Sequence, residues 1–283
     1  MTRLLVLLGD PVAHSLSPRF QNAALEAEGL DARYVAMRVD ESDLPGLLRG
    51  IARAGGAGNV TLPHKRIAAR TVEVATEAVR LTGACNTFWF EDGAIHGDNT
   101  DVDGLRGAIG ALLDRPLDGS RSLVLGAGGG ARAAVLALAR EGAATISIRN
   151  RTRSRAQRLV EEMAESVAPT RLEVWVPAPD SGPVQRLGEG PGVVVNATSL
   201  GLRESDPLPL DASEMPAGAV AMDLVYAEGG TRWVRRLRDA GWTAADGREM
   251  LLRQGALSFE RWWGRPAPID AMRTALDSSE ATP

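Results

Sequence analysis

The pattern of apolar and polar positions in the first hundred residues predicts strands that alternate with helices. The apolar run at 3–8 (RLLVLL) stops at a Gly-Asp-Pro sequence, which is typical of a buried parallel strand. A helix is expected next, with Ser17 as its N-cap and its end near Glu28. Two further strands and the helix between them are predicted at 32–39, 57–60 and 40–55. This alternation indicates a largely parallel sheet in a first α/β unit.

The later residues repeat the alternation and predict a second α/β unit. A strand, a glycine turn and a helix are expected over 121–143, and another strand and helix over 145–165. Three more strands are predicted at 172–176, 192–199 and 219–226. The stretch 177–192, rich in glycine and proline, predicts a surface connection. The tail is expected to be helical over 246–264 and again after Pro268.

Composition narrows the class of protein. The 283 residues, 44% hydrophobic and 24% charged, are typical of a soluble globular protein of one or two domains. A net charge of -4 gives no reason to expect a nucleic acid or an anionic membrane as partner. One cysteine, Cys85, allows no internal disulfide, and no signal segment is evident, so we expect a cytoplasmic protein. The three histidines lack zinc-like spacing, so no metal site is expected.

Lys65 stands out because it is the only lysine among 32 basic residues. Unlike a guanidinium group, an ammonium group can release its proton near neutral pH, so this position suggests proton transfer. Thr61 is expected to cap a short helix whose first turn contains Lys65, where a cation meets the unfavourable end of the helix dipole. The alternative is that the arginine bias left one exposed lysine by chance. These residues alone do not decide between the two.

The glycine-rich turn at 126–131 lies between an apolar strand and a helix, where a dinucleotide-binding turn is expected. Glycines let the backbone approach a pyrophosphate, and the helix N-terminus offers N–H groups. No acidic residue lies between Glu141 and Glu161 to bind a ribose 2′-hydroxyl. Arginines at 149, 151, 153 and 155 provide donors for a 2′-phosphate, with Asn150 and Thr152 beside them. These features favour NADP, although a solvated arginine face would also account for the arginines.

Residues 85–101 predict a β-hairpin with its turn at Asp92-Gly93, followed by a helix from Asp101. Asn99, Asp101, Asp103 and Gly104 imitate the first half of an EF-hand loop. Calcium is excluded because Gly110 stands where a bidentate glutamate is required. The acids near Asp101 can simply favour a helix N-terminus that Thr100 caps. Asp101 could also face Lys65.

Nine motifs together resemble the shikimate dehydrogenase family. In order they are GDPVAHSLSP, GNVTLPHK, GACNT, GDNTDVDG, GAGGGARA, NRT, NATSLGL, DLVY and DGREMLLRQGA, and they cover nearly the whole chain. The resemblance implies a two-domain α/β fold. The substrate-binding domain would comprise 1–102 with 246–283, a mostly parallel sheet to which the C-terminal helices return. A Rossmann-like NADP-binding domain would comprise 103–245. The expected reaction is reversible, NADPH-dependent reduction of 3-dehydroshikimate to shikimate, on the pathway to chorismate and the aromatic amino acids.

The resemblance also implies roles for particular residues. Lys65 would be the acid-base group, with Asp101 orienting it. The substrate would be held by Ser15, Ser17, Asn59, Thr61, Asn86, Tyr226 and Gln254. NADP would be bound by Gly126, Ala127, Gly128, Gly129, Gly130, Ala131, Asn150, Arg151, Thr152, Arg155, Thr198, Val225, Gly247 and Met250. The protein would be a monomer or a homodimer.

Independent sequence features bear on some of these roles. Gln254 interrupts an apolar helical series and should need a polar partner, which a backbone carbonyl could also supply. Three features depart from the family pattern: Gly130 in place of alanine, no proline after Tyr226, and Gln21 in place of histidine. The alternatives are a quinate/shikimate or aminoshikimate dehydrogenase, or a catalytically silent NADP-binding sensor. A methylene-tetrahydrofolate dehydrogenase is disfavoured, since its pterin site should be aromatic and only 4% of the chain is aromatic.

Overall fold

The computed structural model describes residues 2–113, 116–175 and 192–278. The chain forms two compact units, Met1–Gly104 with Leu251–Pro283 and Leu105–Met250. The two passages between them fall inside helices α5 (Asp101–Leu112) and α9 (Arg248–Trp263). The predicted surface connection at 177–192 lies almost entirely outside the described residues. None of the described helices is both long enough and apolar enough to cross a membrane.

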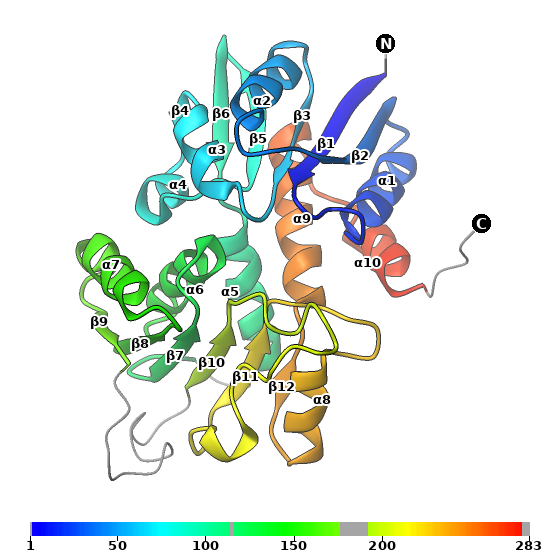
Figure 1. Ribbon diagram of the computed structural model, residues 1–283. Coiled ribbons are helices and arrows are strands. Elements are labelled where there is room, and N and C mark those ends of the chain that lie inside the picture. The colour runs from blue at the N-terminus through cyan, green and yellow to red at the C-terminus, as the bar shows by residue number, and fades with distance from the viewer. Residues whose placement is uncertain (1, 114–115, 176–191, 279–283) are drawn as a thin grey trace. The chain divides into compact units, whose positions relative to one another are not determined.

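The first unit contains a six-stranded sheet in the order β2-β1-β3-β5-β6-β4 (Figure 1). Its strands are β1 (Arg3–Gly9), β2 (Ala32–Arg38), β3 (Ala57–Val60), β4 (Val74–Ala75), β5 (Thr87–Glu91) and β6 (Ala94–Asp98). All pair in parallel except β5, which runs antiparallel to both β3 and β6. The mostly parallel sheet expected for this part of the chain is confirmed.

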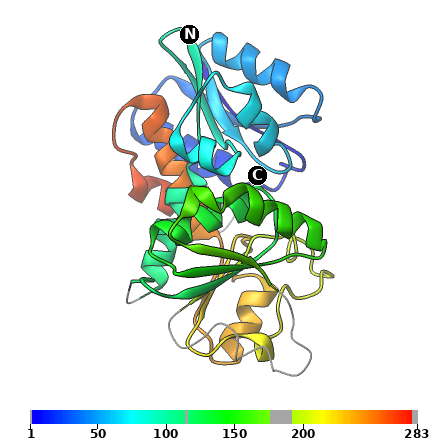
Figure 2. The same cartoon turned by 90° about the vertical axis from the view of Figure 1, so that its left-hand side faces the viewer.

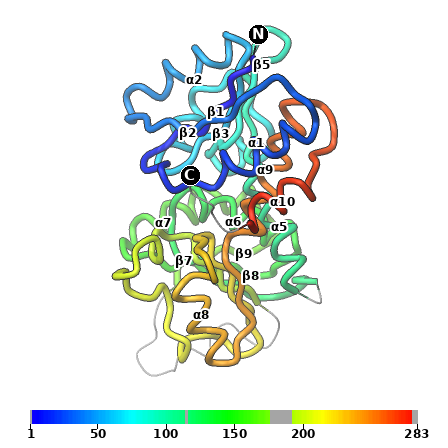
Figure 3. Tube along the Cα trace, turned by 90° about the vertical axis from the view of Figure 1, so that its right-hand side faces the viewer, coloured from blue at the N-terminus to red at the C-terminus, as the bar shows by residue number. Residues whose placement is uncertain are grey.

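Alternation along β1 divides the core of this unit between the two faces of the sheet. Leu5 and Leu7 belong to one apolar cluster, and Val6 and Leu8 belong to the other. This follows from the two-residue period of a strand, and it explains why β1 is apolar throughout. The first cluster is covered by α1 (Ser17–Ala27), α9 and α10 (Ile269–Asp277), and the second by α2 (Leu44–Arg53), α3 (Lys65–Thr71) and α4 (Glu77–Thr82). Figure 3 shows α10 beside α1, so the C-terminal segment completes the unit that the N-terminus begins.

The second unit contains a six-stranded sheet in the order β12-β11-β10-β7-β8-β9, with every pair parallel. Its strands are β7 (Arg121–Leu125), β8 (Thr145–Arg149), β9 (Arg171–Val174), β10 (Val193–Asn196), β11 (Val220–Asp223) and β12 (Ala244–Ala245). Numbered from β7, this is the 3-2-1-4-5-6 order of a dinucleotide-binding sheet, and the order reverses between β7 and β10. Ligands of such sheets bind beyond the carboxyl ends of the strands at this reversal.

Helices cover both faces of the second sheet. Figure 2 shows the green helices α6 (Gly129–Arg140) and α7 (Arg153–Met163) along one face and the gold helix α8 (Arg232–Asp239) on the other. Trp233, Val234 and Leu237 of α8 pack in one apolar cluster with side chains of β7, β10 and β11. The predicted strands and the helices after β7 and β8 are confirmed. The short elements α4, α8, β4 and β12 were not predicted, because they span eight residues at most and show too little of a period.

The predicted hairpin is confirmed. Glu91 pairs with Ala94, and Asp92 and Gly93 between them have φ angles of 49° and 80°. Both residues therefore lie in the left-handed region, which a two-residue hairpin turn of this type requires. The turn places β6 beside β5, so β6 ends at the same end of the sheet at which β5 starts.

Two predicted helix caps are wrong. Ser17 is the first residue of α1 rather than its cap, and the hydroxyl of Ser15 accepts the Ser17 N–H at 3.2 Å. Thr61 does not cap α3, which begins at Lys65 with His64 as N-cap. The N–H of Thr61 instead donates to Leu8 at 2.8 Å, because Thr61 continues the pairing of β3 with β1. A turn over 62–64 then separates the strand from the helix.

Candidate active site

The candidate catalytic residues lie at one end of the first sheet, where its parallel strands have their carboxyl ends; we call this end its carboxyl edge. Lys65 follows β3, and Asp101 follows β6, which runs in the same direction. Asn86 precedes β5, and because β5 is antiparallel its amino end lies at this same edge. The loop after β1 brings Ser15 and Ser17 to this edge as well. The topology therefore gathers residues from distant parts of the sequence at one end of the sheet.

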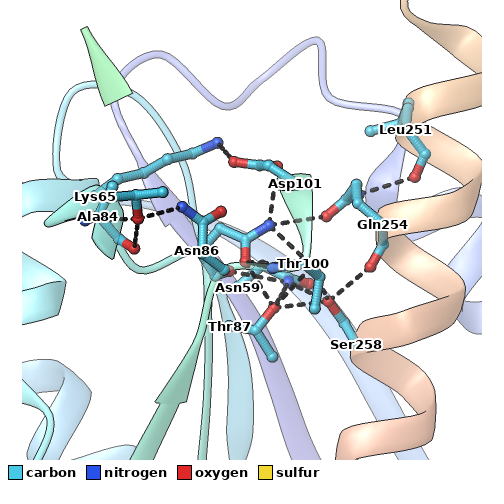
Figure 4. Close-up of polar contacts among 12 residues, drawn as sticks. Asn59, Lys65, Ala84, Asn86, Thr87, Thr100, Asp101, Leu251, Gln254 and Ser258 are labelled. Atoms are coloured by element: carbon cyan, nitrogen blue, oxygen red, sulfur yellow. Dashed lines mark hydrogen bonds and ion pairs between the residues drawn. The ribbon is translucent and has the colours of Figure 1, made fainter. Parts of the chain in front are cut away.

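Lys65 and Asp101 form an ion pair. The Lys65 Nζ lies 2.5 Å from the Asp101 Oδ2, and the two side chains are 15% and 6% exposed (Figure 4). The carbonyl of Lys65 also accepts the N–H of Cys85 at 2.9 Å, which ties the start of α3 to the segment before β5. The sequence alone did not decide whether Lys65 is a functional group or an exposed surface charge. In the structure it is largely buried and paired with Asp101.

Asn86 fixes the other oxygen of Asp101. Its Nδ2 donates to Asp101 Oδ1 at 2.9 Å, while its Oδ1 accepts the backbone N–H of Thr100 at 2.8 Å. A backbone N–H can only donate, so this second contact sets the orientation of the amide and turns its N–H groups toward Asp101. Every partner described for the Asp101 carboxylate is then a donor. Such an arrangement suits a charged carboxylate that holds an ammonium group.

Gln254 reaches this cluster from α9. Its Oε1 accepts from Asn86 Nδ2 at 3.3 Å, and its Nε2 donates to the carbonyl of Leu251 at 2.8 Å. The polar partner and the backbone carbonyl considered from the sequence are therefore both present. Gly104 allows this approach, because a Cβ there would lie 2.8 Å from the Cβ of Gln254.

Asn59 is buried among protein partners. Its Oδ1 accepts from the Tyr34 hydroxyl at 2.8 Å, and its Nδ2 lies 3.0 Å from the Asn86 carbonyl and 2.9 Å from the hydroxyls of Thr87 and Ser258. The resemblance implies a substrate contact for Asn59, but these partners already use both polar atoms of the side chain. Ser258 was not predicted at all. Its signal was available, since it lies four residues after Gln254 on the same apolar helix face.

Three hydroxyls lie at the ends of β1 and β3. The Ser15 hydroxyl bonds Ser17 as described above, whereas those of Ser17 and Thr61 have no hydrogen-bond partner within the described part of the chain. Ser17 is buried and Thr61 half-buried. Gln21, which departs from the family pattern, is buried and donates to the carbonyl of Gly255 at 2.9 Å. It therefore ties α1 to α9 next to Gln254.

In the second unit, the predicted cofactor residues follow the carboxyl ends of neighbouring parallel strands. Residues 126–131 follow β7, 150–155 follow β8, Thr198 follows β10, Val225 follows β11, and Gly247 follows β12. Met250 is the last residue of this unit, in α9. Tyr226 also belongs to this unit, so its predicted proximity to Gln254 stays a prediction.

The glycine turn has the geometry expected of a phosphate-binding turn. Gly126 has a φ of 114°, and a Cβ there would lie 2.7 Å from the carbonyl oxygen of Ala197. Gly128 is the N-cap of α6, and a Cβ there would meet no protein atom within 4 Å. Space is therefore open beside Gly128 at the start of α6, where the first N–H groups of a helix can bind an anion. The residues present fit a dinucleotide pyrophosphate.

The arginines after the glycine turn separate into two kinds. Arg149 pairs with Glu214 at 3.0 Å, so it serves the fold of the unit. Arg151, Arg153 and Arg155 are exposed and have no ion pair within the described ranges. The side chain of Asn150 donates to the carbonyl of Thr152 at 2.8 Å, which shapes the turn before α7. Donors for a 2′-phosphate are thus available in the segment that the sequence indicated.

A buried carboxylate holds two of the predicted cofactor residues in place. Asp223 Oδ1 accepts the Val225 N–H at 3.0 Å and the Asn196 side-chain amide at 2.8 Å. Asn196 in turn accepts the Thr198 hydroxyl at 2.7 Å. Burial raises the pKa of Asp223 to about 6, partly offset by hydrogen bonds from Thr231, Val225 and Asn196.

This shift predicts a pH-dependent effect of Asp223→Asn on stability. A folded-state pKa of about 6, above the ordinary 3.8, means that the wild-type protein loses stability as pH rises through this range. An amide cannot ionise, so the unfolding free energy of the variant relative to wild type should rise by ~1.4 kcal/mol between about pH 5 and about pH 7.5. Urea unfolding at both pH values measures this change. Asp239→Asn, an exposed site on α8, is the control and should show no such change; a pH-independent difference for Asp223→Asn would contradict the assignment.

Comparisons with known proteins agree with this geometry. Family profiles described as the shikimate dehydrogenase substrate binding domain, shikimate / quinate 5-dehydrogenase and the shikimate 5'-dehydrogenase C-terminal domain match residues 7–88, 111–175 and 247–276. Shikimate dehydrogenases (NADP(+)) of Halobacterium salinarum and Methanopyrus kandleri are 42% and 39% identical, over 95% and 97% of this chain and 97% and 95% of theirs. The structure of shikimate 5-dehydrogenase from Thermus thermophilus in complex with NADP(H) and shikimate superposes with a TM-score of 0.82. It is 36% identical, covering 97% of this chain and 98% of that one.

Proposed function

The chain belongs to the shikimate dehydrogenase family, and from this premise we propose that Lys65 and Asp101 are its proton-transfer pair. The enzyme is an NADP-dependent oxidoreductase that interconverts 3-dehydroshikimate and shikimate, on the pathway to the aromatic amino acids. The quinate and sensor alternatives are not favoured. The observation that carries the proposal is the 2.5 Å contact between Lys65 Nζ and Asp101 Oδ2 at the carboxyl edge of the first sheet.

Each residue of the pair has its own task. Bound NADPH supplies the hydride that the ring carbonyl carbon receives. Lys65 Nζ donates a proton to the developing alkoxide during reduction and accepts that proton from the hydroxyl during oxidation. Asp101 holds the ammonium group in position, and Asn86 holds the opposite oxygen of Asp101. A positioned acid-base group is typically worth ~10²–10⁴-fold in rate.

We assign the substrate contacts to residues at the same edge. The hydroxyls of Ser15, Ser17 and Thr61 would bind polar groups of the substrate, and Asn86 and Gln254 would bind its ring hydroxyls. The hydroxyl hydrogens of Ser15, Ser17 and Thr61 and one amide hydrogen of Gln254 have no acceptor within the described residues, which supports their assignment. Asn86 is assigned on the resemblance alone, because its amide hydrogens already face Thr100, Asp101 and Gln254. Tyr226 is assigned a substrate contact on the resemblance alone. For Asn59 we propose a supporting role, because its polar atoms are occupied by Tyr34, Asn86, Thr87 and Ser258.

The cofactor contacts are assigned along the edge of the second sheet. The N–H groups of residues 126–131 would hold the pyrophosphate at the start of α6. Asn150, Arg151, Thr152 and Arg155 would bind the 2′-phosphate, with Arg153 as a further exposed cation. Thr198, Val225, Gly247 and Met250 would line the rest of the cofactor. The first unit would then be the substrate domain and the second the NADP domain.

The function is tested by an absorbance assay at the NADPH band. Shikimate and quinate are each offered with NADP⁺ and with NAD⁺, which gives four initial rates. The expected result is turnover mainly with shikimate and NADP⁺. A preference for quinate would instead support the quinate/shikimate alternative. NADP⁺ binding without turnover of either ring acid would support the sensor.

The cellular compartment and the oligomeric state are two further proposals. Burial raises the pKa of the Cys85 thiol to about 12, so the single cysteine of the chain is a packing group and fits a reducing cytoplasm. We propose a monomer or a homodimer. Light scattering of the purified enzyme distinguishes these two states.

A further inference from the structure

The hydroxyl of Ser258 lies at the centre of the polar cluster behind the catalytic pair. Ser258 is fully buried on α9, one turn after Gln254 (Figure 4). Its Oγ lies 2.9 Å from the Gln254 carbonyl, 2.9 Å from Asn59 Nδ2, 2.7 Å from Thr87 Oγ1 and 3.2 Å from Thr100 Oγ1. One small side chain thus contacts helix α9, β3, β5 and the start of α5.

Two of these hydrogen bonds have a defined direction. Ser258 has a single hydroxyl hydrogen, and the carbonyl of Gln254 four residues earlier accepts it. A lone pair of Ser258 then accepts from the Asn59 amide, and the Thr87 hydroxyl lies 2.7 Å away in a contact where either oxygen can donate. Ser258 therefore offers an acceptor to the Asn59 amide of the sheet, one turn of α9 after Gln254.

The neighbours of Ser258 are the chain neighbours of the residues that hold Lys65. Thr87 directly follows Asn86, and Thr100 directly precedes Asp101. Because Ser258 Oγ contacts both threonines, one oxygen spans the two backbone segments from which Asn86 and Asp101 extend. A shift of either segment would change the contact between Asn86 Nδ2 and Asp101 Oδ1.

We propose that Ser258 is a positioning residue for proton transfer, which it supports by keeping Asn86 and Asp101 in register with each other. This role rests on the proposed function of the Lys65–Asp101 pair. Ser258 is uncharged and its hydrogen is used within α9, so it moves no proton itself. It acts on the rate through the geometry of groups that do, and small misplacements of such groups are costly.

The test is a double-mutant cycle between Ser258→Ala and Asp101→Asn. Alone, Ser258→Ala should lower kcat for shikimate oxidation about tenfold and leave the KM for NADP⁺ unchanged. In the Asp101→Asn background it should change kcat less than about twofold, because the group it positions is already lost. Thr170→Val removes another buried hydroxyl, directly before β9 in the second unit, and controls for a general loss of stability.

Several results would overturn the proposal. One is a kcat of Ser258→Ala close to that of wild type. A second is an equal loss in both backgrounds, and a third is a loss no larger than that of Thr170→Val. If the alanine variant does not fold, Ser258→Cys carries the test, since a thiol leaves no cavity but bonds weakly and should show the same dependence on Asp101. A wild-type enzyme inactive on shikimate would instead contradict the proposed function.

Discussion

Replacing Lys65 with alanine should lower kcat for shikimate oxidation about 10²–10⁴-fold, with little change in KM for either substrate. Lys65 is the group that we assign to proton transfer, and its ammonium is held by Asp101 at 2.5 Å. Removing the side chain leaves the polar cluster around Asn86 intact, since its hydrogen bonds do not involve Lys65. Steady-state kinetics at the NADPH band give both constants. Near-normal turnover would remove Lys65 from the mechanism.

Lys65→Arg is the matched control for charge. A guanidinium group can still pair with Asp101, but it does not release its proton at accessible pH. We therefore expect a loss of kcat close to that of the alanine variant. If Lys65→Arg kept wild-type turnover, the site would need only a positive charge at this position, and proton transfer would have to be assigned elsewhere.

Gly126→Ala should weaken NADP⁺ binding by at least about tenfold and lower thermal stability. At this position the backbone has a φ of 114°, and a Cβ would lie 2.7 Å from the Ala197 carbonyl oxygen. Relief of this clash requires the turn after β7 to move away from β10, at the point where the strand order reverses. The N–H groups of α6, which we assign to the pyrophosphate, would then be displaced. Isothermal titration with NADP⁺ and a thermal melt measure the two effects.

Two other glycines serve as controls for this variant. Gly110→Ala lies on an exposed side of α5 with no atom near the new Cβ, and it should stabilise the protein by about 0.5–1 kcal/mol. Gly128→Ala also meets no protein atom, so it should cost only the loss of a favourable N-cap residue, at most about 1 kcal/mol, and still weaken NADP⁺ binding, because the cofactor needs that space. Equal binding by Gly126→Ala and wild type would contradict the assigned turn.

Much of the fold was predictable because its strands are apolar on both faces and its turns carry distinctive residues. The alternation of β1 between two cores requires the continuous run at 3–8. The Asp92-Gly93 turn requires two left-handed residues, which this dipeptide provides readily. Lys65 was identifiable as unusual because all the remaining Lys or Arg positions of the chain hold arginine. These signals are local, so the sequence displays them directly.

The remaining features depend on contacts that the sequence does not display. Ser17 was predicted to be a helix cap, but it is the first residue of α1, and its N–H donates to the hydroxyl of Ser15. Asn59 lies in a family motif, which implied a substrate contact. Its side chain instead bonds Tyr34 and Ser258, which are distant in the chain. Arg149 looked like its arginine neighbours until the fold paired it with Glu214. Such outcomes are decided by tertiary packing.

The most direct test of the pair is the kcat of Lys65→Ala, Asp101→Asn and the double variant, measured with shikimate and NADP⁺. If the two groups act as one unit, the double variant should turn over about as fast as the slower single variant, because the second substitution removes nothing further. If instead the two losses multiply, Lys65 and Asp101 contribute independently, and the proton-transfer pair would be contradicted.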